Sequence, residues 1–522
     1  MSISLYLLLG ATFVISAWAL KLSSERKSAS SVSKLPVPPG ASFLFGHEKT
    51  VFYEQPGRAF RNWIEKCGLT YRIKAAFGAP DIVVLGDPMG IEYLTQKRIY
   101  DYHHSRVVRP RVGRFLGRGL GWVEGEDEHK RMKRLINPSL SAETLRTMAP
   151  DVRDAASRVL NDMSQVLEAN NGAIKNVDVL HWTARAALNV VGRIAFLYDF
   201  EGGHGEDAEN ILHGRRRGVT PMARYTGFIF LMLLRRFPIL NDLPIPAIQA
   251  QAIARLTIQN GVAREMIRRN KDFVDKHSKD LLSALLIAYS ENRISLEELN
   301  EQISTFVMAG HEATTLTLGF TLWELAHNQE VQNRLREEIA NWPGEPTYDD
   351  YVSGLPYLDA VLNETLRKYP GLAYMERVAT KEDSIPLKEP ITLTDGRVVN
   401  SVEVAPGQTI LVPIIAIQRL DSVWTDGDTW RPERWLGDRN PTEKMWPGYA
   451  NLLVFGSNGP RTCIGAKLAI FVYKIVLSGL VTRFRFEGTG EELALGIASS
   501  LQPWLKDKTE MGPQIPVHMY AL

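Results

Sequence analysis

Apolar stretches of very different lengths stand out along this chain, and each length predicts a different element. Residues 3–20 are almost wholly apolar and uncharged, and about 18 such residues are enough to cross a bilayer core as a helix. Residues 227–234 form a second apolar run, flanked by arginines, that is too short to span. We predict a transmembrane anchor at residues 1–22 and a buried helix segment at 227–234. A contact with the membrane surface is the alternative for the second run.

Shorter patterns predict elements in the body of the chain. Residues 82–85 and 411–417 are apolar runs typical of buried strands. Residues 394–397, Thr-Asp-Gly-Arg, have the composition of a hairpin turn. Residues 295–298 form a capping box, and few charges follow it until His327. This pattern predicts a long helix that is buried on most sides.

The charges around the first apolar run predict its orientation. No basic residue precedes the run, so it lacks the charged start of a secretory signal peptide. Lysines and arginines follow it, which places the rest of the chain in the cytosol. A cleaved signal peptide is the alternative interpretation. Residues 23–40 are basic and proline-rich, and the prolines predict an extended, stiff connector.

Composition narrows the class of protein. With 45% hydrophobic and 23% charged residues, the chain can bury a large core. The net charge of +2 gives no indication of a nucleic-acid partner. The only two cysteines, Cys67 and Cys463, are distant in sequence, which provides no disulfide framework and fits a reducing compartment.

Cys463 is the residue with the most informative surroundings. It lies in a loop rich in glycine that leads into a helix-like run at 466–470. A helix N-terminus and the nearby Arg461 are both expected to make the thiol easier to deprotonate. A lone thiolate does not make a zinc site, which needs three or four ligands. It suits haem iron, which takes one axial thiolate because the porphyrin supplies the other nitrogens. A buried structural cysteine is the alternative.

The segment Phe-Gly-Ser-Asn-Gly-Pro-Arg-Thr-Cys-Ile-Gly resembles the haem-binding loop of cytochromes P450, whose pattern is Phe-x-x-Gly-x-Arg-x-Cys-x-Gly. From Gly459 to Gly465 the match is complete in order and spacing. Phe455, which the resemblance places at the cofactor, lies one residue too far upstream. Either the loop carries an insertion near Asn458, or Phe455 is not the usual phenylalanine.

Two further motifs resemble the structural network of the same family. Glu364 and Arg367 match Glu-x-x-Arg, and their spacing places both side chains on one helix face. Residues 430–435 resemble the Pro-Glu-Arg-Phe/Trp segment, whose arginine is Arg434 here. The resemblance implies that these three residues form a buried charged network. It also implies a mostly α fold with small β-sheets, in which residues 41–522 are one haem-binding catalytic domain.

Residues 308–315, Met-Ala-Gly-His-Glu-Ala-Thr-Thr, resemble the oxygen-activating segment of the family's long central helix. The resemblance makes Glu312 the catalytic acid and places His311 away from the haem. The family usually has threonine next, where this chain has Ala313. Thr314 is about 100° further round the helix. We predict a catalytic role for Glu312 and Thr314. Either the helix is distorted, or water or a substrate hydroxyl replaces the threonine, or proton delivery is altered.

The resemblance also implies how haem b is held. Cys463 is expected to be the axial iron ligand, and Arg461 and Arg377 are expected to pair with the anionic haem propionates. His129 and Lys133, at i and i+4, match the helix that commonly holds a propionate. Lysine at 133 replaces the expected arginine, so a bidentate clamp is lost there. The neighbouring basic residues predict a solvated face that attracts the acidic flavin domain of a reductase.

The resemblance predicts a microsomal, fungal-type haem-thiolate monooxygenase. The enzyme is expected to hydroxylate or oxidise a lipophilic small molecule with O2 and electrons from NADPH, through NADPH–cytochrome P450 reductase. A single-pass anchor in the endoplasmic reticulum membrane and a cytosolic catalytic domain are expected, and terpenoid or other secondary metabolism is the expected context. The alternatives are a haem-thiolate isomerase or dehydratase that needs no reductase, favoured by Ala313 and the longer haem loop, and a non-catalytic haem or steroid carrier.

Substrate specificity is expected from four segments by their place in the family pattern. They are residues 102–120, the central helix near Phe306 and Ala309, residues 372–375, and the turn at 499–501.

Overall fold

The computed structural model of the protein describes residues 31–216, 221–243, 246–270, 279–437 and 446–522. Within these residues the chain is mostly helical with small sheets, which confirms the predicted fold class. The predicted anchor at residues 1–22 lies outside the described residues. Among the helices of the described part, none has the length and apolar character that crossing a bilayer requires.

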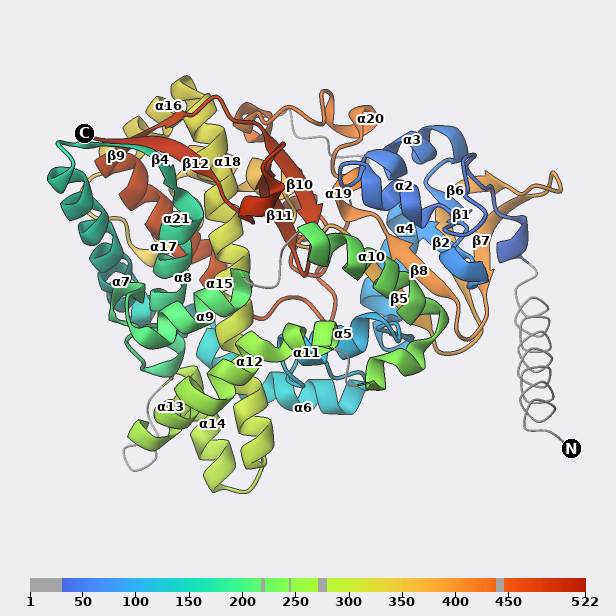
Figure 1. Cartoon of the computed structure of the whole chain (residues 1–522), viewed down its shortest axis with the longest axis horizontal. Helices are drawn as coiled ribbons and strands as arrows, with labels where there is room; N and C mark the ends of the chain where they lie inside the picture. The colour runs from blue at the N-terminus through green and yellow to red at the C-terminus, as the bar shows by residue number, and fades with distance from the viewer. Residues whose placement is uncertain (1–30, 217–220, 244–245, 271–278, 438–445) are drawn as a thin grey trace, which may run out of the picture.

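Helices make up the larger part of the molecule and gather on the left of Figure 1, around one long helix that runs through the middle. The helices are α2 (Glu48–Tyr53), α3 (Arg58–Cys67), α4 (Pro88–Glu92), α5 (Val108–Phe115), α6 (Glu126–Ile136), α7 (Ala142–Ala169), α8 (Val179–Phe196), α9 (Glu206–Arg216), α10 (Pro221–Arg236), α11 (Pro246–Gln249), α12 (Ile253–Thr257), α13 (Ala263–Asn270), α14 (Leu281–Ser290), α15 (Leu296–His327), α16 (Gln329–Ala340), α17 (Tyr348–Ser353), α18 (Pro356–Lys368), α19 (Ile414–Ile417), α20 (Asp421–Trp424) and α21 (Ala466–Arg483).

Twelve strands of the described part form four small sheets. The strands are β1 (Thr70–Ile73), β2 (Ile82–Leu85), β3 (Tyr102–His103), β4 (Ala173–Asp178), β5 (Met375–Ala379), β6 (Asp383–Thr392), β7 (Val398–Val404), β8 (Thr409–Val412), β9 (Phe484–Gly488), β10 (Leu493–Ile497), β11 (Leu501–Leu505) and β12 (Pro516–Ala521). The largest sheet has the order β1-β2-β8-β5-β3, and β4-β12-β9, β6-β7 and β10-β11 form the others. In the largest sheet only β2 and β8 pair in parallel.

The apolar side chains of these elements pack into two clusters. The larger joins α7, α8, α15, α18 and α21. The smaller joins α3 with β1, β2, β8, β6 and β7, on the right of Figure 1. Tyr374 and Val423 pack against both clusters. The candidate site draws its residues from elements of both clusters, so this junction fixes their relative positions.

The central helix α15 begins where the capping box predicts. The Ser295 hydroxyl accepts from the Glu298 N–H at 3.1 Å. The carboxylate of Glu298 binds Arg131 of α6 at 2.5 Å, so it serves a partner outside the helix. Most residues of α15 are buried, as predicted. Helix α8 packs closely along it, because a Cβ on Gly310 would lie 3.0 Å from the methyl groups of Val191.

Three local predictions can be compared with the structure. Residues 82–85 form the fully buried strand β2, as predicted. The hairpin turn at 394–397 joins β6 to β7, with Gly396 at φ +85°. The predicted strand at 411–417 is wrong beyond Val412, because Pro413 interrupts the run and residues after it form the short helix α19. Proline has no backbone N–H for a sheet, so the ladder ends there.

Part of the predicted connector is described, and it lies against the sheets. Leu35 is buried in the smaller cluster. The Leu35 carbonyl accepts from the Arg72 side chain at 3.2 Å, and the Pro38 carbonyl is 2.9 Å from the ring of His47. The residues just before the domain are therefore held by main-chain hydrogen bonds. The predicted division at residues 22 and 40 stays a prediction.

The second apolar run lies in α10, and only part of it is buried. Met232 and Leu234 are buried, and the ring of Phe228 stacks on Phe52 of α2 with centroids 4.0 Å apart. The chain after the helix exposes Phe237 and Ile239. The buried-helix interpretation therefore holds for Met232 and Leu234, and the other residues of the run are only partly buried or exposed.

Candidate active site

Cys463 lies three residues before α21 begins at Ala466, with Gly465 as the N-cap. Its backbone N–H donates to the Phe455 carbonyl at 2.7 Å, which closes the loop. The side chain is exposed, yet burial by the surrounding protein raises the pKa of the Cys463 thiol, partly offset by a backbone hydrogen bond from Gly465. The direction for the free thiol is opposite to the easing of deprotonation expected from the sequence, because desolvation outweighs the Gly465 hydrogen bond. A coordinated metal deprotonates a thiol outright.

The stretch before Cys463 has an unusual backbone. Phe455, Gly456, Ser457 and Asn458 have φ angles of +55°, +85°, +59° and +57°. Four consecutive left-handed residues make a tight turn at the place where the sequence is one residue longer than the family pattern. The Ser457 carbonyl accepts from Gln96 at 2.8 Å, and the ring of Phe455 packs edge-on against a tyrosine.

A cluster of cations lies beside this loop. Arg461 donates from Nη1 to the Val123 carbonyl at 2.7 Å and from Nη2 to the Glu124 carbonyl at 2.8 Å. Arg377 lies on β5 and is 9% exposed. Burial, with Arg461 nearby, lowers the pKa of Arg377 to about 10. The Glu124 carboxylate lies 3.7 Å from Arg461 and stabilises both cations only in part.

Glu124 and His104 complete the cluster, and the sequence analysis missed both. One oxygen of Glu124 lies 2.7 Å from Nδ1 of His104 and accepts the His104 backbone N–H at 2.9 Å. Although burial by itself raises the pKa of Glu124, the hydrogen bonds from His104 hold it at about 2. Burial, with Arg377 alongside, lowers the pKa of His104 to about 4. Neither residue belongs to a recognisable motif, and they meet only in the folded chain.

The cluster fits the carboxylates of a haem. Nε and Nη1 of Arg377 and Nε of Arg461 are buried and have no hydrogen-bond partner in the part of the chain that is described. Buried donors of this kind are normally satisfied, and a guanidinium group pairs well with carboxylates. These nitrogens lie on the two arginines that the family pattern assigns to the propionates. The residues present therefore fit the predicted cofactor.

The structure places His129 and Lys133 of α6 near the same loop, but in contact with protein groups. Nδ1 of His129 lies 3.0 Å from the Tyr100 hydroxyl, and burial, then Arg461 and Lys133, lower the pKa of His129 to about 4. Nζ of Lys133 donates to the Pro460 carbonyl at 2.8 Å. The contact with a propionate that the family pattern implies for these two residues stays a prediction.

The structure brings Glu364, Arg367 and Arg434 together. Arg367 donates from Nε and Nη2 to the two oxygens of Glu364, each at 2.8 Å, and Nε of Arg434 donates to the same carboxylate at 3.0 Å. Glu364 and Arg367 are fully buried. The remaining guanidinium nitrogens of Arg367 and Arg434 donate to backbone carbonyls of residues 418–429. This network ties α18 to the segment before the haem loop.

The central helix exposes a narrow stripe of mostly apolar residues. Ala309 and Ala313 are exposed, and Phe306 and Thr317 are half-buried, on a helix that is otherwise mostly buried. Spacings of three and four residues place them on one face. Thr317 was missed by the sequence analysis, although its position four residues after Ala313 is a usable signal. Its hydroxyl donates to the Ala313 carbonyl at 2.9 Å.

Thr314 and His311 lie off this stripe. Thr314 is buried, and its hydroxyl is 3.4 Å from the Gly310 carbonyl. His311 is buried, and its Nδ1 lies 2.7 Å from the Val307 carbonyl of the same helix. The helix continues without a break through this segment, so Thr314 does not take the place of a hydroxyl at 313. Its catalytic role stays a prediction, and the geometry favours Thr317 as the hydroxyl nearest the exposed face.

Glu312 is half-buried beside the stripe and contacts the turn between β10 and β11. Its Oε1 accepts from the hydroxyls of Ser499 at 3.1 Å and Ser500 at 2.5 Å, and from the side chain of Gln502 at 3.4 Å. The same turn meets α5, because Arg111 donates to the Ala498 carbonyl at 2.9 Å. The structure thus joins three of the segments predicted to contact substrate.

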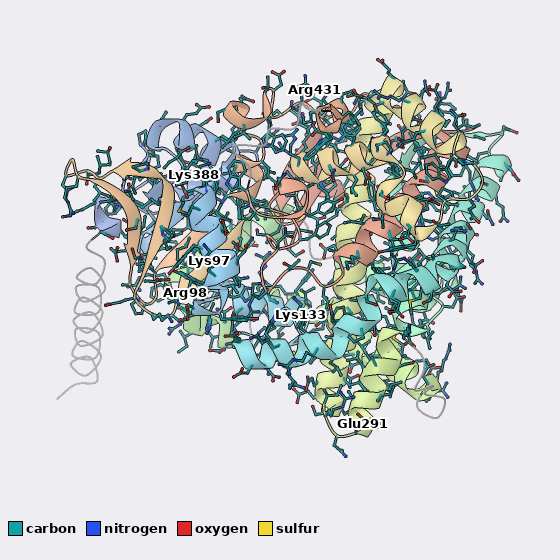
Figure 2. All side chains as sticks on the ribbon, turned by 180° about the vertical axis from the view of Figure 1, so that it is seen from behind. Lys97, Arg98, Lys133, Glu291, Lys388 and Arg431 are labelled. Carbon is teal, nitrogen blue, oxygen red and sulfur yellow. The ribbon has the colours of Figure 1, made fainter. Side chains whose placement is uncertain are left out.

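The solvent side of α6 is less positive than predicted. Lys130 pairs with Glu126 at 2.6 Å, and Arg131 binds Glu128 and Glu298. Figure 2 labels three further basic residues, which lie at separate places on this view of the molecule: Lys97, Lys133 and Arg431. Within the described residues no group of three or more His, Cys, Asp or Glu is arranged to hold a metal ion, so Cys463 is the metal-binding candidate there.

Comparison with known proteins agrees with this site. A family model described as Cytochrome P450 matches residues 36–495. Cytochrome P450 monooxygenase claW of Ampulloclitocybe clavipes is 30% identical and covers 91% of this chain and 90% of its own. Cytochrome P450 monooxygenase claP of the same fungus is 29% identical over 97% of both chains, and cytochrome P450 monooxygenase 91 of Postia placenta is 32% identical over 91% of both. The chain therefore belongs to the cytochrome P450 monooxygenases, a family of haem-thiolate oxidoreductases.

Proposed function

We propose that this chain is a membrane-anchored monooxygenase that hydroxylates or further oxidises a lipophilic small molecule, with electrons that NADPH supplies through its reductase. The observation that carries the proposal is the set of buried, unpartnered guanidinium nitrogens on Arg377 and Arg461, next to the loop of Cys463. Such a set favours an anionic ligand beside the thiolate, and haem would provide both the propionates and the iron.

The bound haem supplies the activation of O2, which the axial thiolate favours. The chain supplies the thiolate of Cys463 and orients the cofactor through Arg377 and Arg461. The complete charge network at Glu364 keeps the segment before the haem loop in place. Cys463 would hold the iron of the cofactor, and Arg377 and Arg461 would hold its carboxylates.

Glu312 is the residue proposed to hold and pass protons, at its Oε1 atom. Its carboxylate is hydrogen-bonded at the edge of the stripe rather than enclosed in the core. Ala313 provides no hydroxyl, and the hydroxyl of Thr317 lies one turn further along the same face. Proton delivery therefore depends on Glu312, with water or Thr317 in the place of the missing threonine.

The stripe also supports a lipophilic substrate. Phe306, Ala309 and Ala313 present only carbon atoms from their side chains, and Leu372 is 52% exposed after α18. Exposed apolar side chains at a ligand site favour an apolar ligand. The relatives named above are fungal monooxygenases, and secondary metabolism, with terpenoids as the substrate class, is the context proposed for the reaction.

Membrane association is proposed for a patch of exposed apolar side chains that two parts of the described chain form. Phe43, Leu44 and Tyr53 are exposed near the start of the described chain, and Phe237, Ile239 and Leu243 are exposed after α10. The stacking of Phe228 on Phe52 holds these two groups together. A patch of exposed apolar side chains marks a membrane or protein contact. We assign it to the endoplasmic reticulum membrane, with the catalytic domain in the cytosol.

The reductase is proposed to dock where basic residues border the haem loop. Lys133 contacts that loop through Pro460, and the side chain of Lys97 is 63% exposed. Figure 2 shows both on the same view of the molecule. Basic groups at this position attract an acidic partner and raise the rate of encounter.

A haem-thiolate isomerase or dehydratase is the second candidate. Ala313 and the four left-handed residues at 455–458 favour it, since both depart from the monooxygenase pattern. Such an enzyme rearranges a peroxide and needs neither reductase nor proton delivery.

One experiment separates the two functions. Purified protein is combined with the reductase, and NADPH consumption, product and hydrogen peroxide are measured in the wild type and in Glu312→Gln, Thr314→Ala, Thr317→Ala and Ala313→Thr. A monooxygenase consumes NADPH, and Glu312→Gln slows product formation because an amide does not relay protons. We expect Ala313→Thr to lower peroxide release, and Thr317→Ala to raise it more than Thr314→Ala. Absence of NADPH consumption would select the isomerase.

A further inference from the structure

The turn at residues 498–500, between β10 and β11, is hydrogen-bonded to Glu312 of the central helix. Ser499, Ser500 and Gln502 all donate to one oxygen of Glu312. We propose that this turn positions the catalytic acid, with Ser500 and Gln502 as the positioning residues. The proposal rests on the monooxygenase function proposed above, in which Glu312 handles protons.

The hydrogen bonds form a directed chain that fixes the carboxylate. Gln502 is 7% exposed, and its Nε2 donates to the Ser500 oxygen at 2.8 Å. The Ser500 hydroxyl then donates to Glu312 at 2.5 Å, which is the shortest of the three contacts. Because the Ser500 oxygen accepts from Gln502, its own proton is directed at the carboxylate. Hydrogen bonds to an ionised group are stronger than those between neutral groups, so this chain holds one rotamer of Glu312.

The turn is itself held from two further sides. The Leu501 N–H donates to the Gly371 carbonyl at 3.2 Å, and Arg111 of α5 donates to the Ala498 carbonyl at 2.9 Å. Both contacts come from segments that lie in, or directly next to, those expected to meet the substrate. A ligand that displaces α5 or the loop at 371 therefore also moves the turn, and through Ser500 it moves Glu312. The position of the acid is coupled to occupancy of the substrate site.

Ala313 explains why this chain needs such a contact. Residue 313 has no hydroxyl, and the hydroxyls of Thr314 and Thr315 donate to the carbonyls of Gly310 and His311 in the same helix. The hydroxyls beside Glu312 in the described structure come from the C-terminal hairpin instead. The hairpin thus carries a positioning role for proton delivery in addition to contact with substrate.

The activity test compares Ser500→Ala with Ser500→Thr and with the control Ser353→Ala, whose serine is exposed on α17. The haem-loaded protein is mixed with reductase, NADPH and 7-ethoxycoumarin as a probe, and hydrogen peroxide released per NADPH is measured with and without the probe. Loss of a hydrogen bond to a charged group predicts a rise of about threefold to tenfold in this ratio for Ser500→Ala. Ser500→Thr, which keeps the hydroxyl, restores the wild-type ratio, and Gln502→Leu raises it less than Ser500→Ala.

A second readout does not depend on turnover. Amide hydrogen exchange at residues 497–501 of the haem-loaded protein is expected to become faster by about tenfold in both Ser500→Ala and Glu312→Leu, which removes the acceptor oxygens. Unchanged exchange in Glu312→Leu overturns the contact itself. A peroxide ratio in Ser500→Ala equal to that of Ser353→Ala, or one that Ser500→Thr fails to restore, overturns the positioning role. If the wild type consumes no NADPH, the proposed function fails and the role in proton delivery fails with it, while the exchange result still reports the contact.

Discussion

Two buried groups of arginines differ in one respect that separates structure from function. Around Glu364, each guanidinium nitrogen of Arg367 and Arg434 donates to a carboxylate or a backbone carbonyl. Around Glu124, Arg377 and Arg461 are largely enclosed as well, with the Arg461 side chain 10% exposed, but they keep buried guanidinium nitrogens without partners in the described structure. The first group is completed by the protein alone.

The difference lies in what each group needs to become stable. A buried ion pair that has all its hydrogen bonds stabilises only the arrangement that it connects, and removing one member leaves a charge uncompensated. A buried cation without a partner destabilises the free protein until an anion binds. The second group is therefore a binding site for the propionates, and the first is a structural support. The predictions below test this distinction.

The largest effect is expected at Cys463, since the anion site has meaning only if the iron ligand lies beside it. In Cys463→Ser the reduced protein should lose the long-wavelength carbon-monoxide band of haem-thiolate proteins completely. Cys67→Ser is the matched control, because Cys67 is a partly buried cysteine at the end of α3. Survival of the band in Cys463→Ser, together with its loss in Cys67→Ser, would show the assignment to be wrong.

Glu364→Ala should break the complete group. Both arginines then remain buried without their carboxylate, at a cost of about 3–5 kcal/mol in the free energy of unfolding. We expect the variant not to accumulate as haem-loaded protein, measured as haem content per polypeptide. Glu297→Ala removes an exposed glutamate from the first turn of α15 and serves as the control. Normal haem content and stability in Glu364→Ala would mean that the network is dispensable.

Arg377→Met should not destabilise the haem-free protein, in contrast to Glu364→Ala. Replacing an unpaired buried cation with an apolar side chain is expected to leave the unfolding free energy of haem-free protein unchanged or to raise it by about 1 kcal/mol. Haem should dissociate roughly tenfold faster or more, since a charge-assisted hydrogen bond is lost. Arg434→Met is the comparison and should destabilise the haem-free protein. The distinction fails if both variants lose the same stability, measured by denaturant unfolding and by haem transfer to apomyoglobin.

The last comparison concerns pH, where the effect appears only outside the neutral range. The pKa of His104 is about 4 in the folded chain against an ordinary 6.5. Between pH 6.5 and pH 4 the unfolded chain therefore binds a proton at this residue that the folded chain does not bind. The unfolding free energy therefore falls as pH drops through this window, by up to about 3 kcal/mol from this residue. His104→Gln should flatten the dependence of the unfolding midpoint on pH between 6.5 and 4. A slope from His129 persists, because its pKa is also about 4.

Glu124 acts in a lower range than His104. Its folded pKa of about 2 lies below the ordinary 4.5, so it contributes stability above pH 4.5 that is lost as the pH falls towards 2. Glu124→Gln should remove this lower slope without changing the one between pH 6.5 and 4 that belongs to His129. An unchanged profile below pH 4.5 would show that the carboxylate has no such role.

The elements with a local signal were predictable from sequence. The capping residue at 295, the strand at 82–85 and the turn at 394–397 each depend on neighbours within a few residues, and all three are present. The failure at 411–417 has a local cause as well, because Pro413 ends the strand that the apolar run predicts. The apolar run alone does not show where a strand ends, and the proline within it does.

The missed site residues depend on contacts between distant segments. His104 reaches Glu124 across twenty positions, and Glu312 reaches Ser500 across 188. No spacing rule connects such pairs, and a single sequence contains no record of their contact. The surroundings of Arg461 depend on such contacts too, because its guanidinium group donates to the Val123 and Glu124 carbonyls of a distant segment.

The four left-handed residues before Cys463 have a consequence for the order in which the holoprotein assembles. A non-glycine residue in this conformation is unfavourable by about 1–2 kcal/mol, and three such residues follow one another around Gly456. The energy that holds them comes from the Cys463 to Phe455 and Gln96 to Ser457 hydrogen bonds and from the surrounding core. The protein's own contacts thus contribute to the shape of the ligand loop, which lowers the ordering of the chain that haem capture requires.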